Sequence, residues 1–215
     1  MAAYLMLVAP AAIADIINIG DYVKLIDYNS LDSAGIMTYA VSKDKGVTTA
    51  FTYDTFCIQD NVYIYLNQWY PVADLSNDVG FFDSPKPAGA GELNGAVDYL
   101  FYRYKSGAYN TTMISHAIES DFQKVLWSLQ GSGPSYSSTG YLWDTDLSTY
   151  DAVPSMHHSW GTEVINIVSS KDGNGNFHGP DIQNQLYNQV PEPSSLLLLS
   201  SGLAGIGLLR RRLKS

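Results

Sequence analysis

Cysteine and charged residues are scarce in this sequence. Cys57 is the only cysteine among 215 residues, which excludes a framework of disulfides within the chain. Charged residues make up 15% of the chain and hydrophobic residues 46%, a composition typical of a globular protein rather than a disordered one. The net charge of −9 argues against a nucleic-acid partner, because phosphate contacts need a basic surface.

Motifs of catalysis and of cofactor binding are also missing. The sequence holds no internal repeat and no Gly-rich phosphate loop. Glu119 and Asp121 fall on different faces of an expected helix and therefore do not form a glycosidase pair. Three histidines lack the mutual spacing of metal ligands, namely His157, His158 and His178. We therefore predict a protein that is not an enzyme and that uses no cofactor or metal.

The N-terminus, MAAYLMLVAPAAIAD, has an apolar run over residues 5–14. The run ends in Ala12, Ile13 and Ala14, the small-x-small pattern that signal peptidases accept, although no Lys or Arg precedes it. We interpret residues 1–14 as the remnant of a signal peptide and predict that the protein is exported. A buried first strand is the alternative interpretation.

The C-terminus, VPEPSSLLLLSSGLAGIGLLRRRLKS, combines an apolar run with a basic end. Residues 196–209 are almost wholly apolar but fall short of the ~20 residues that a stable membrane-spanning helix needs. Three arginines follow directly, which places the C-terminal end in the cytoplasm by the positive-inside rule. Pro191 and Pro193 keep the chain before the run extended. We predict a single hydrophobic helix preceded by an extended motif that a protease can reach.

This arrangement, over residues 188–215, resembles the PEP-CTERM sorting signal. The matching positions are Pro191, Glu192 and Pro193 in the motif and Arg210, Arg211 and Arg212 in the basic tail. The resemblance implies a Gram-negative bacterial protein that is held transiently in the inner membrane and processed by an exosortase. Such proteins are associated with extracellular polysaccharide, so we expect the cell surface or the extracellular matrix as the destination. An ordinary C-terminal anchor would explain the helix but not the Pro-Glu-Pro motif.

Residues 15–187 form the expected extracytoplasmic domain. Near period-two patterns of β-branched and aromatic residues predict strands over 21–29, 35–42, 48–58, 62–72 and 162–168. Apolar residues at helical spacing predict helices over 96–107 and 115–131, the first capped by Asn94 and the second ended by Gly131. We expect a turn or loop over residues 171–179. Together these elements predict an α+β fold, a β-sandwich-like domain with a small helical insertion.

The stretch TYDTFCIQD around Cys57 permits four interpretations of the thiol. A buried cysteine that behaves as a small hydrophobe is the default. Cys57 could instead pair with another chain, or act as a thiolate nucleophile beside a base. The nearest histidine in sequence is His116, and no local signature supports a Cys-His enzyme. The fourth interpretation is a crosslink to a side chain other than cysteine.

The crosslink interpretation draws on the stretch DFQKVLW in the second expected helix. Gln123 and Trp127 are four residues apart and therefore share a face of that helix. The pairing of TFCI in a strand with FQKVLW at a helix start resembles the thioester domain of bacterial surface proteins, over about residues 52–129. The resemblance implies an internal thioester, in which the sulfur of Cys57 displaces ammonia from the side chain of Gln123.

A thioester reacts with amines and hydroxyls and is hydrolysed when water reaches it, so its site must stay dry. The residues expected to shield it are Phe56, Phe122, Trp127 and Tyr53. The implied function is adhesion by a single covalent attachment to surface nucleophiles or to extracellular polysaccharide.

A passive structural or glycan-binding matrix protein without a thioester is the alternative function. In that case Cys57 and Gln123 simply pack together in the core. The aromatic residues that would line a glycan-binding surface are Trp69, Tyr70, Trp143 and Trp160, although such residues more often belong to a core.

Overall fold

The fold is seen in a computed structural model, which describes residues 16–31, 34–59, 64–79, 89–137, 140–156, 159–171, 174 and 177–188. Nearly all of these residues lie in one compact unit, Ile17–Gln189. The expected signal-peptide remnant at 1–14 lies outside the described residues. The sorting segment does too, from residue 189 onward, including its expected hydrophobic helix.

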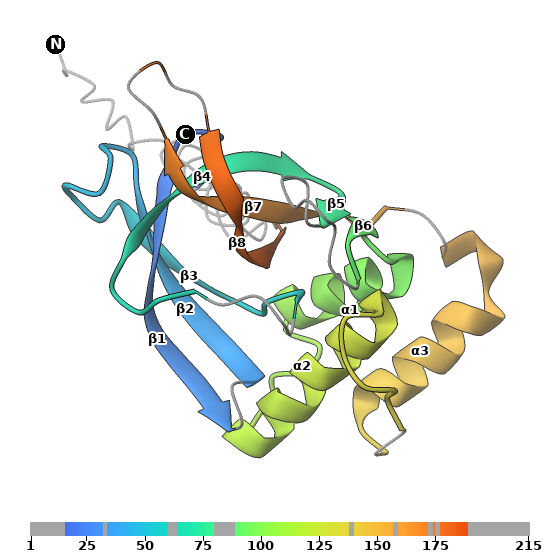
Figure 1. Ribbon diagram of the computed structural model, residues 1–215. Coiled ribbons are helices and arrows are strands. Elements are labelled where there is room, and N and C mark those ends of the chain that lie inside the picture. The colour runs from blue at the N-terminus through green and yellow to red at the C-terminus, as the bar shows by residue number, and fades with distance from the viewer. Residues whose placement is uncertain are drawn as a thin grey trace, which may run out of the picture. The chain divides into compact units, whose positions relative to one another are not determined.

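Six of the described strands form one antiparallel sheet with the order β3-β2-β1-β4-β7-β8 (Figure 1). Their bounds are β1 Tyr22–Leu31, β2 Ala34–Ser42, β3 Phe51–Thr55, β4 Trp69–Ser76, β7 Thr162–Lys171 and β8 Phe177–Asn188. A separate two-stranded pair consists of β5 Asp78–Val79 and β6 Gly91–Glu92. The order shows that β4 joins the N-terminal hairpin to the C-terminal one.

The sheet is curled, and its inner face is apolar. Alternate side chains of β1 and β2 point inward and are almost completely buried, among them Val23, Leu25, Tyr39 and Val41. Register shifts interrupt the pairing of β1 with β2, of β4 with β7 and of β7 with β8. Such bulges increase the local twist of a strand, so they favour curling over a flat sheet.

The curl brings the two edge strands of the sheet together. After Thr55 the chain leaves β2 and runs beside β8, where the N–H of Ile58 donates to the carbonyl of Asn184 at 3.0 Å. The N–H of Leu186 donates to the carbonyl of Phe56 at 3.1 Å. Cys57 forms an isolated antiparallel bridge with Gln185 between these two hydrogen bonds. Cys57 therefore lies where the segment after β3, at one edge of the sheet, pairs with β8 at the other edge.

Three described α-helices follow β6: α1 Gly95–Lys105, α2 His116–Gln130 and α3 Leu142–Ala152, with a 3-10 turn, η1, at Pro154–Met156. The Asn94 side chain accepts the N–H of Ala96 at 2.8 Å, which confirms the predicted cap of α1. Gly131 ends α2 in the left-handed conformation at a φ of 78°, which glycine adopts without strain. Helix α2 packs on β1 and β2, α1 packs on β7 and β8, and α3 packs on α1.

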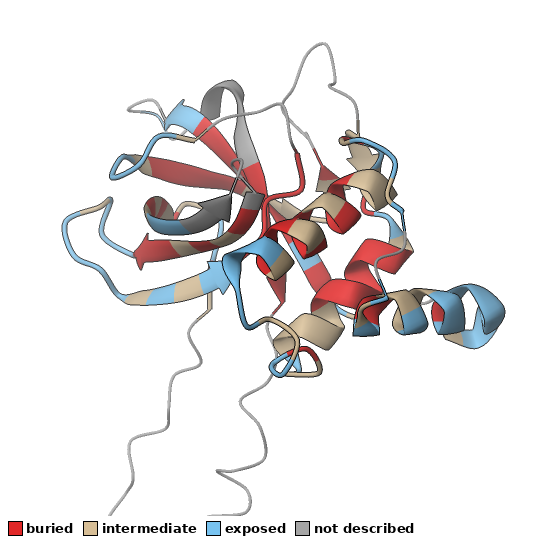
Figure 2. Ribbon diagram, turned by 90° about the horizontal axis from the view of Figure 1, so that it is seen from below, coloured by how far each residue is buried: buried red, intermediate tan, exposed pale blue. Residues whose placement is uncertain are grey.

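Helix α2 contributes residues to two apolar clusters. Figure 2 colours the buried stretches of the sheet and of the helices red. The helix-side cluster includes Phe56, Phe122 and Trp143. The sheet-side cluster includes Tyr39, Cys57 and Trp127. Because successive residues of an extended chain point to opposite faces, Phe56 and Cys57 enter different clusters.

The structure confirms the α+β class but differs from the expectation in its layers. Six of the described strands make one curled sheet rather than two stacked sheets, and helices α1 and α2 pack on its strands. Residues 62 and 63 of the strand predicted over 62–72 lie outside the described residues. In the described part, β4 begins at Trp69, because residues 64–68 include a turn with Asn67 at a φ of 62°. Helix α3 was not predicted. Strand β8 occupies much of the segment 171–188, part of which was expected to be a loop.

Candidate functional site

The structure brings Cys57 and Gln123 into direct contact, although 66 residues separate them in the sequence. The backbone N–H of Cys57 donates to Oε1 of Gln123 at 3.1 Å, and Nε2 of Gln123 donates to the carbonyl of Cys57 at 2.5 Å. The Cys57 thiol also donates to Oε1, with Sγ at 3.6 Å. Both residues have no exposed surface. The side-chain amide therefore lies against the sulfur, away from solvent.

Cys57 is positioned by the backbone on both sides of it. Backbone hydrogen bonds to β8 hold Phe56 and Ile58 in place. The hydroxyl of Ser132 also donates to the carbonyl of Ile58 at 3.0 Å. The hydroxyl of Thr55 donates to the carbonyl of Leu186. These bonds fix the backbone of the extended segment at residues 55–58, from which the Cys57 side chain reaches Gln123 of α2.

Gln123 is positioned by the apolar residues that surround it on α2. Phe122 packs edge-on against Phe56, with ring centroids 5.1 Å apart, and lies 5.2 Å from Trp143. Trp127, one turn further on, is 7% exposed and belongs to the cluster that holds Cys57. Of the four residues expected to shield the site, Phe56, Phe122 and Trp127 are buried and Tyr53 is partly buried. Phe56 and Phe122 belong to the helix-side cluster, whereas Trp127 belongs to the sheet-side cluster with Cys57.

The surroundings of the contact disfavour ionised groups. Burial raises the pKa of Tyr39 well above its usual value, and neighbouring Tyr53, Cys57 and Tyr70 raise it further. Burial also raises the pKa of Tyr53, with a smaller contribution from Tyr187.

The structure gives no support to a Cys-His pair with His116. The ring of His116 lies at the exposed start of α2, where Nδ1 contacts Oε2 of Glu119 at 3.1 Å. His157 and His158 lie outside the described residues, as does the side chain of His178. Within the described part of the chain, no group of three His, Cys, Asp or Glu side chains could hold a metal ion.

The four aromatic residues considered for a glycan surface do not form one. Tyr70 and Trp143 are 1% and 0% exposed and belong to the two apolar clusters. Trp69 stacks beneath the ammonium of Lys24, which lies 4.7 Å from the ring. Trp160 packs between Tyr99 and Tyr102. The four residues pack against different neighbours in different parts of the domain, so they do not share one surface.

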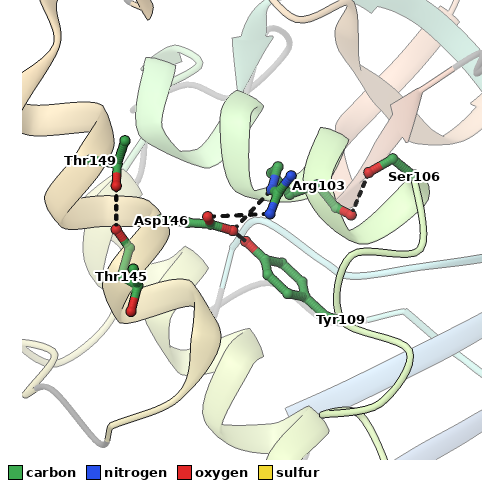
Figure 3. A network of polar contacts seen from close by, with 6 residues as sticks. All are labelled: Arg103, Ser106, Tyr109, Thr145, Asp146 and Thr149. Carbon is green, nitrogen blue, oxygen red and sulfur yellow. Dashed lines mark hydrogen bonds and ion pairs between the residues drawn. The ribbon is translucent and has the colours of Figure 1, made fainter.

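A second network joins α1 to α3, and it is polar and only partly buried (Figure 3). Nε and Nη2 of Arg103 donate to the carboxylate of Asp146 at 3.0 and 3.3 Å, and the Tyr109 hydroxyl donates to it at 2.7 Å. Burial and the carboxylate of Asp146 raise the pKa of Tyr109. The charges are paired within the network, which explains how they are tolerated so close to the core.

The comparisons with known proteins bear on the C-terminal tail. The protein-family model described as the PEP-CTERM protein-sorting motif matches residues 189–212. The chain carries a PEP-CTERM sorting motif. This signal implies an exported protein that an exosortase processes on its way to the cell surface. No curated protein and no solved structure matches the chain.

The matched segment holds the predicted sorting residues, Pro191, Glu192, Pro193, Arg210, Arg211 and Arg212. All six lie outside the residues that the structure describes. Among the described helices, none is long and apolar enough to cross a membrane.

Sequence reasoning missed the groups that hold the candidate site together. These are Ser132, the backbone of β8 at Asn184 and Leu186, and the backbone N–H and carbonyl of Cys57 itself. Backbone groups carry no signal in a single sequence. Ser132 follows the end of α2 within a Gly/Ser-rich stretch, where a serine is expected in any case.

Proposed function

We propose that this is an exported, exosortase-sorted surface protein whose folded domain forms a thioester between Cys57 and Gln123. It would attach covalently to a nucleophile at the cell surface or in the extracellular matrix, and it would do so once rather than as an enzyme. The observation that carries the proposal is the contact of Sγ and Oε1 at 3.6 Å in a site with no exposed surface.

The bond-forming step needs only the groups in contact. The sulfur of Cys57 attacks the side-chain carbonyl carbon of Gln123, the bond from that carbon to Nε2 breaks, and the thiol proton leaves with the nitrogen as ammonia. The backbone N–H of Cys57 already donates to Oε1, the atom on which negative charge develops during the attack. Holding both reactants in one geometry replaces much of the activation that a separate base would supply.

The release step transfers the acyl group to the target. An amine or hydroxyl of the target attacks the same carbon, the carbon–sulfur bond breaks, and the proton of the nucleophile passes to the sulfur. The products are an amide or ester on residue 123 and a restored Cys57 thiol. Burial by Phe56, Phe122 and Trp127 supports this function, because a solvent-exposed thioester would be lost to hydrolysis.

Methylamine treatment of the full-length exported protein tests the proposal. We expect methylamine to add at residue 123, located by peptide mass mapping, and a titratable thiol to appear at Cys57 at the same time. A Cys57→Ala variant is the matched control and should take up no methylamine. If the wild-type protein also takes up none, and Cys57 titrates as a thiol after denaturation alone, the passive matrix protein is the better account.

The sorting half of the proposal has a separate test. Replacing Glu192 by Ala in a host that carries an exosortase should leave the protein in the inner-membrane fraction, because the processing motif is lost. Ser194→Ala, just outside the Pro-Glu-Pro motif, is the control and should be sorted like the wild type. Normal surface delivery of the Glu192→Ala protein would contradict recognition through this motif.

A further inference from the structure

Two loops beside the sheet present large apolar side chains to solvent. Val47, in the loop between β2 and β3, is 80% exposed, and Tyr65 and Leu66, shortly before β4, are 68% and 47% exposed. Trp69, the first residue of β4, is partly buried. Exposed apolar residues that gather in one place mark a surface that meets a partner. We refer to these four residues as the loop patch.

The segment before β4 is fixed against β1. Trp69 lies opposite Lys24 in the pairing of β1 with β4. The N–H of Asn67 donates to the carbonyl of Leu25 at 2.8 Å, two residues before Trp69 in the chain. The turn that carries Leu66 is therefore held against the same strand as Trp69.

The loop between β2 and β3 is fixed against Trp69. Gly46 has a φ of 85°, and a Cβ at this position would lie 2.8 Å from the Trp69 ring, so the close approach requires glycine. The hydroxyl of Ser42 accepts the N–H of Gly46 at 2.8 Å, and the carboxylate of Asp44 accepts the N–H of Val47 at 3.1 Å. The exposure of Val47 is therefore set by a loop with its own hydrogen bonds.

Lysine side chains accompany the loop patch. Although the chain is acidic, three of the eight Lys and Arg residues that precede the sorting segment are Lys24, Lys43 and Lys45. The ammonium of Lys24 lies 4.7 Å from the centroid of the Trp69 ring, and Lys43 pairs with Asp21 at 2.5 Å. Aromatic rings, aliphatic side chains and lysines together are typical of protein surfaces that lie at the boundary between headgroups and acyl chains of a bilayer.

The length of the chain after the domain argues for a bilayer as the partner. Strand β8 ends at Asn188, and the apolar run of the sorting segment begins at residue 196. Eight residue steps span at most about 27 Å. While the apolar run is in a membrane, the domain therefore stays beside the bilayer at a high effective concentration.

The loop patch is within reach of that bilayer. Asn188 pairs with Thr162 of β7, close to the place where Ser76, the last residue of β4, pairs with Val164. Trp69 lies at the other end of β4, and a strand of eight residues spans about 23 Å. The chain after Asn188 is therefore long enough to enter the bilayer while the loop patch lies on it.

We propose that the loop patch docks the folded domain on the lipid bilayer that holds its tail. Val47, Leu66 and Trp69 lie at the level of the headgroups in this arrangement. Lys24 and Lys45 face anionic lipids. The inference rests on the proposed sorting, which puts the tail in the membrane, but not on the thioester. It adds an orientation of the domain, with α3 turned away from the bilayer, because α3 lies on the opposite side of the domain from the loop between β2 and β3 (Figure 1).

Site-specific fluorescence tests which side of the domain meets the bilayer. Full-length Cys57→Ala protein carries one new cysteine, from Leu66→Cys or Leu142→Cys, labelled with a fluorophore that is sensitive to its environment. Leu142 is the matched control, because it is 49% exposed and lies on α3. Each protein is reconstituted into vesicles of phosphatidylethanolamine and phosphatidylglycerol, with a quencher attached to some of the headgroups.

We expect the quencher to reduce the fluorescence at residue 66 and to leave that at residue 142 unchanged. Lys45→Glu should lower the ratio of docked to undocked protein about fivefold or more, because each lysine near an anionic surface favours binding. Equal quenching at residues 66 and 142 would overturn the docking and leave the anchoring intact. A signal at residue 66 that depends on protein density and not on the quencher would overturn it in favour of contact between copies.

Flotation of the same vesicles separates failure of the docking from failure of the anchoring. A tail inserted in the bilayer keeps the protein on the vesicles at high salt, whereas docking through lysines is weakened by salt. Protein that floats only at low salt, with quenching at residue 66, would support the docking and contradict insertion of the tail. Protein that does not float even at low salt would overturn both.

Discussion

The Cys57–Gln123 contact and the Arg103–Asp146–Tyr109 network both join segments that are distant in the sequence, but they differ in chemistry. The contact is neutral, has no exposed surface and places a thiol against an amide. The network is charged, and the Arg103 side chain is 39% exposed. The charges of the network are paired with each other and form only an ion pair. The thiol of Cys57 and the amide of Gln123 together contain a nucleophile and a leaving group.

The difference separates a structural connection from a candidate reactive one. An ion pair near the surface contributes little to stability and is easily replaced. The buried side-chain amide of Gln123 bonds both the N–H and the carbonyl of Cys57, so its removal is costly. These two bonds require one position of the amide. The predictions below remove one member from each region and compare the results.

Gln123→Ala should have the largest effect on stability. The substitution leaves the N–H and carbonyl of Cys57 without their side-chain partner and opens a cavity beside the thiol. We expect a loss of about 3–5 kcal/mol in the free energy of unfolding, measured by chemical denaturation. A loss near zero would show that the backbone of Cys57 finds other partners and that the contact is incidental.

Asp146→Ala should cost less, about 1–3 kcal/mol, because Arg103 can turn to solvent when its partner is removed. Asp146→Asn is the matched variant, since it keeps an acceptor for Tyr109 and removes only the charge. It should lie between the wild type and the alanine variant in the same denaturation assay. A larger loss than that of Gln123→Ala would reverse the comparison between the two regions.

Phe122→Leu tests the shielding of the contact with a smaller change in volume. Phe122 lies against Phe56, Tyr109 and Trp143, so a smaller side chain loosens the packing next to Gln123. We expect faster loss of methylamine reactivity on storage in water, with a destabilisation of about 1–2 kcal/mol. Ile118→Val, on the partly buried side of the same helix, is the control and should keep the wild-type rate. Equal rates in all three proteins would argue against a role of Phe122 in excluding water.

Alkaline pH should destabilise the domain through its buried tyrosines, both those of the sheet-side cluster and Tyr109 of the polar network. Burial raises the pKa of Tyr39 and of Tyr53 above the ordinary value of 10.0, so the folded state keeps their protons when the unfolded chain has lost them. The stabilising contribution is complete below pH 10 and declines as the pH rises above it. Denaturation followed from pH 8 to 11 should show this decline, and Tyr53→Phe should reduce its slope. A flat profile would mean that these hydroxyls are more solvated than the structure places them.

The elements that could be predicted from the sequence are those with a complete local pattern. The helix cap at Asn94, the end of α2 at Gly131 and the strands β1, β2 and β7 all follow from such patterns. Within the described part of the strand expected over 62–72, residues 64–68 are not strand, because a turn at Asn67 interrupts the apolar stretch. Helix α3 was missed because LWDTDLSTYDA buries few of its residues, Trp143 and Tyr150 among them, and so lacks a continuous apolar stripe.

The pairing of Cys57 with Gln123 came from a resemblance of short motifs, and the structure places the two side chains in contact. What the sequence could not give is the route by which Cys57 arrives there. That route depends on the curl of the sheet, which brings β8 beside the segment after β3, and such long-range pairing leaves no local pattern.

The intact mass of the full-length exported protein, purified without added nucleophiles, tests the central claim most directly. The account predicts a mass lower by one ammonia than the mass calculated from the processed chain, and no such deficit in Cys57→Ala. A wild-type mass equal to the calculated one, in protein that was never exposed to amines, would contradict the thioester and leave Cys57 and Gln123 as a packed pair in the core.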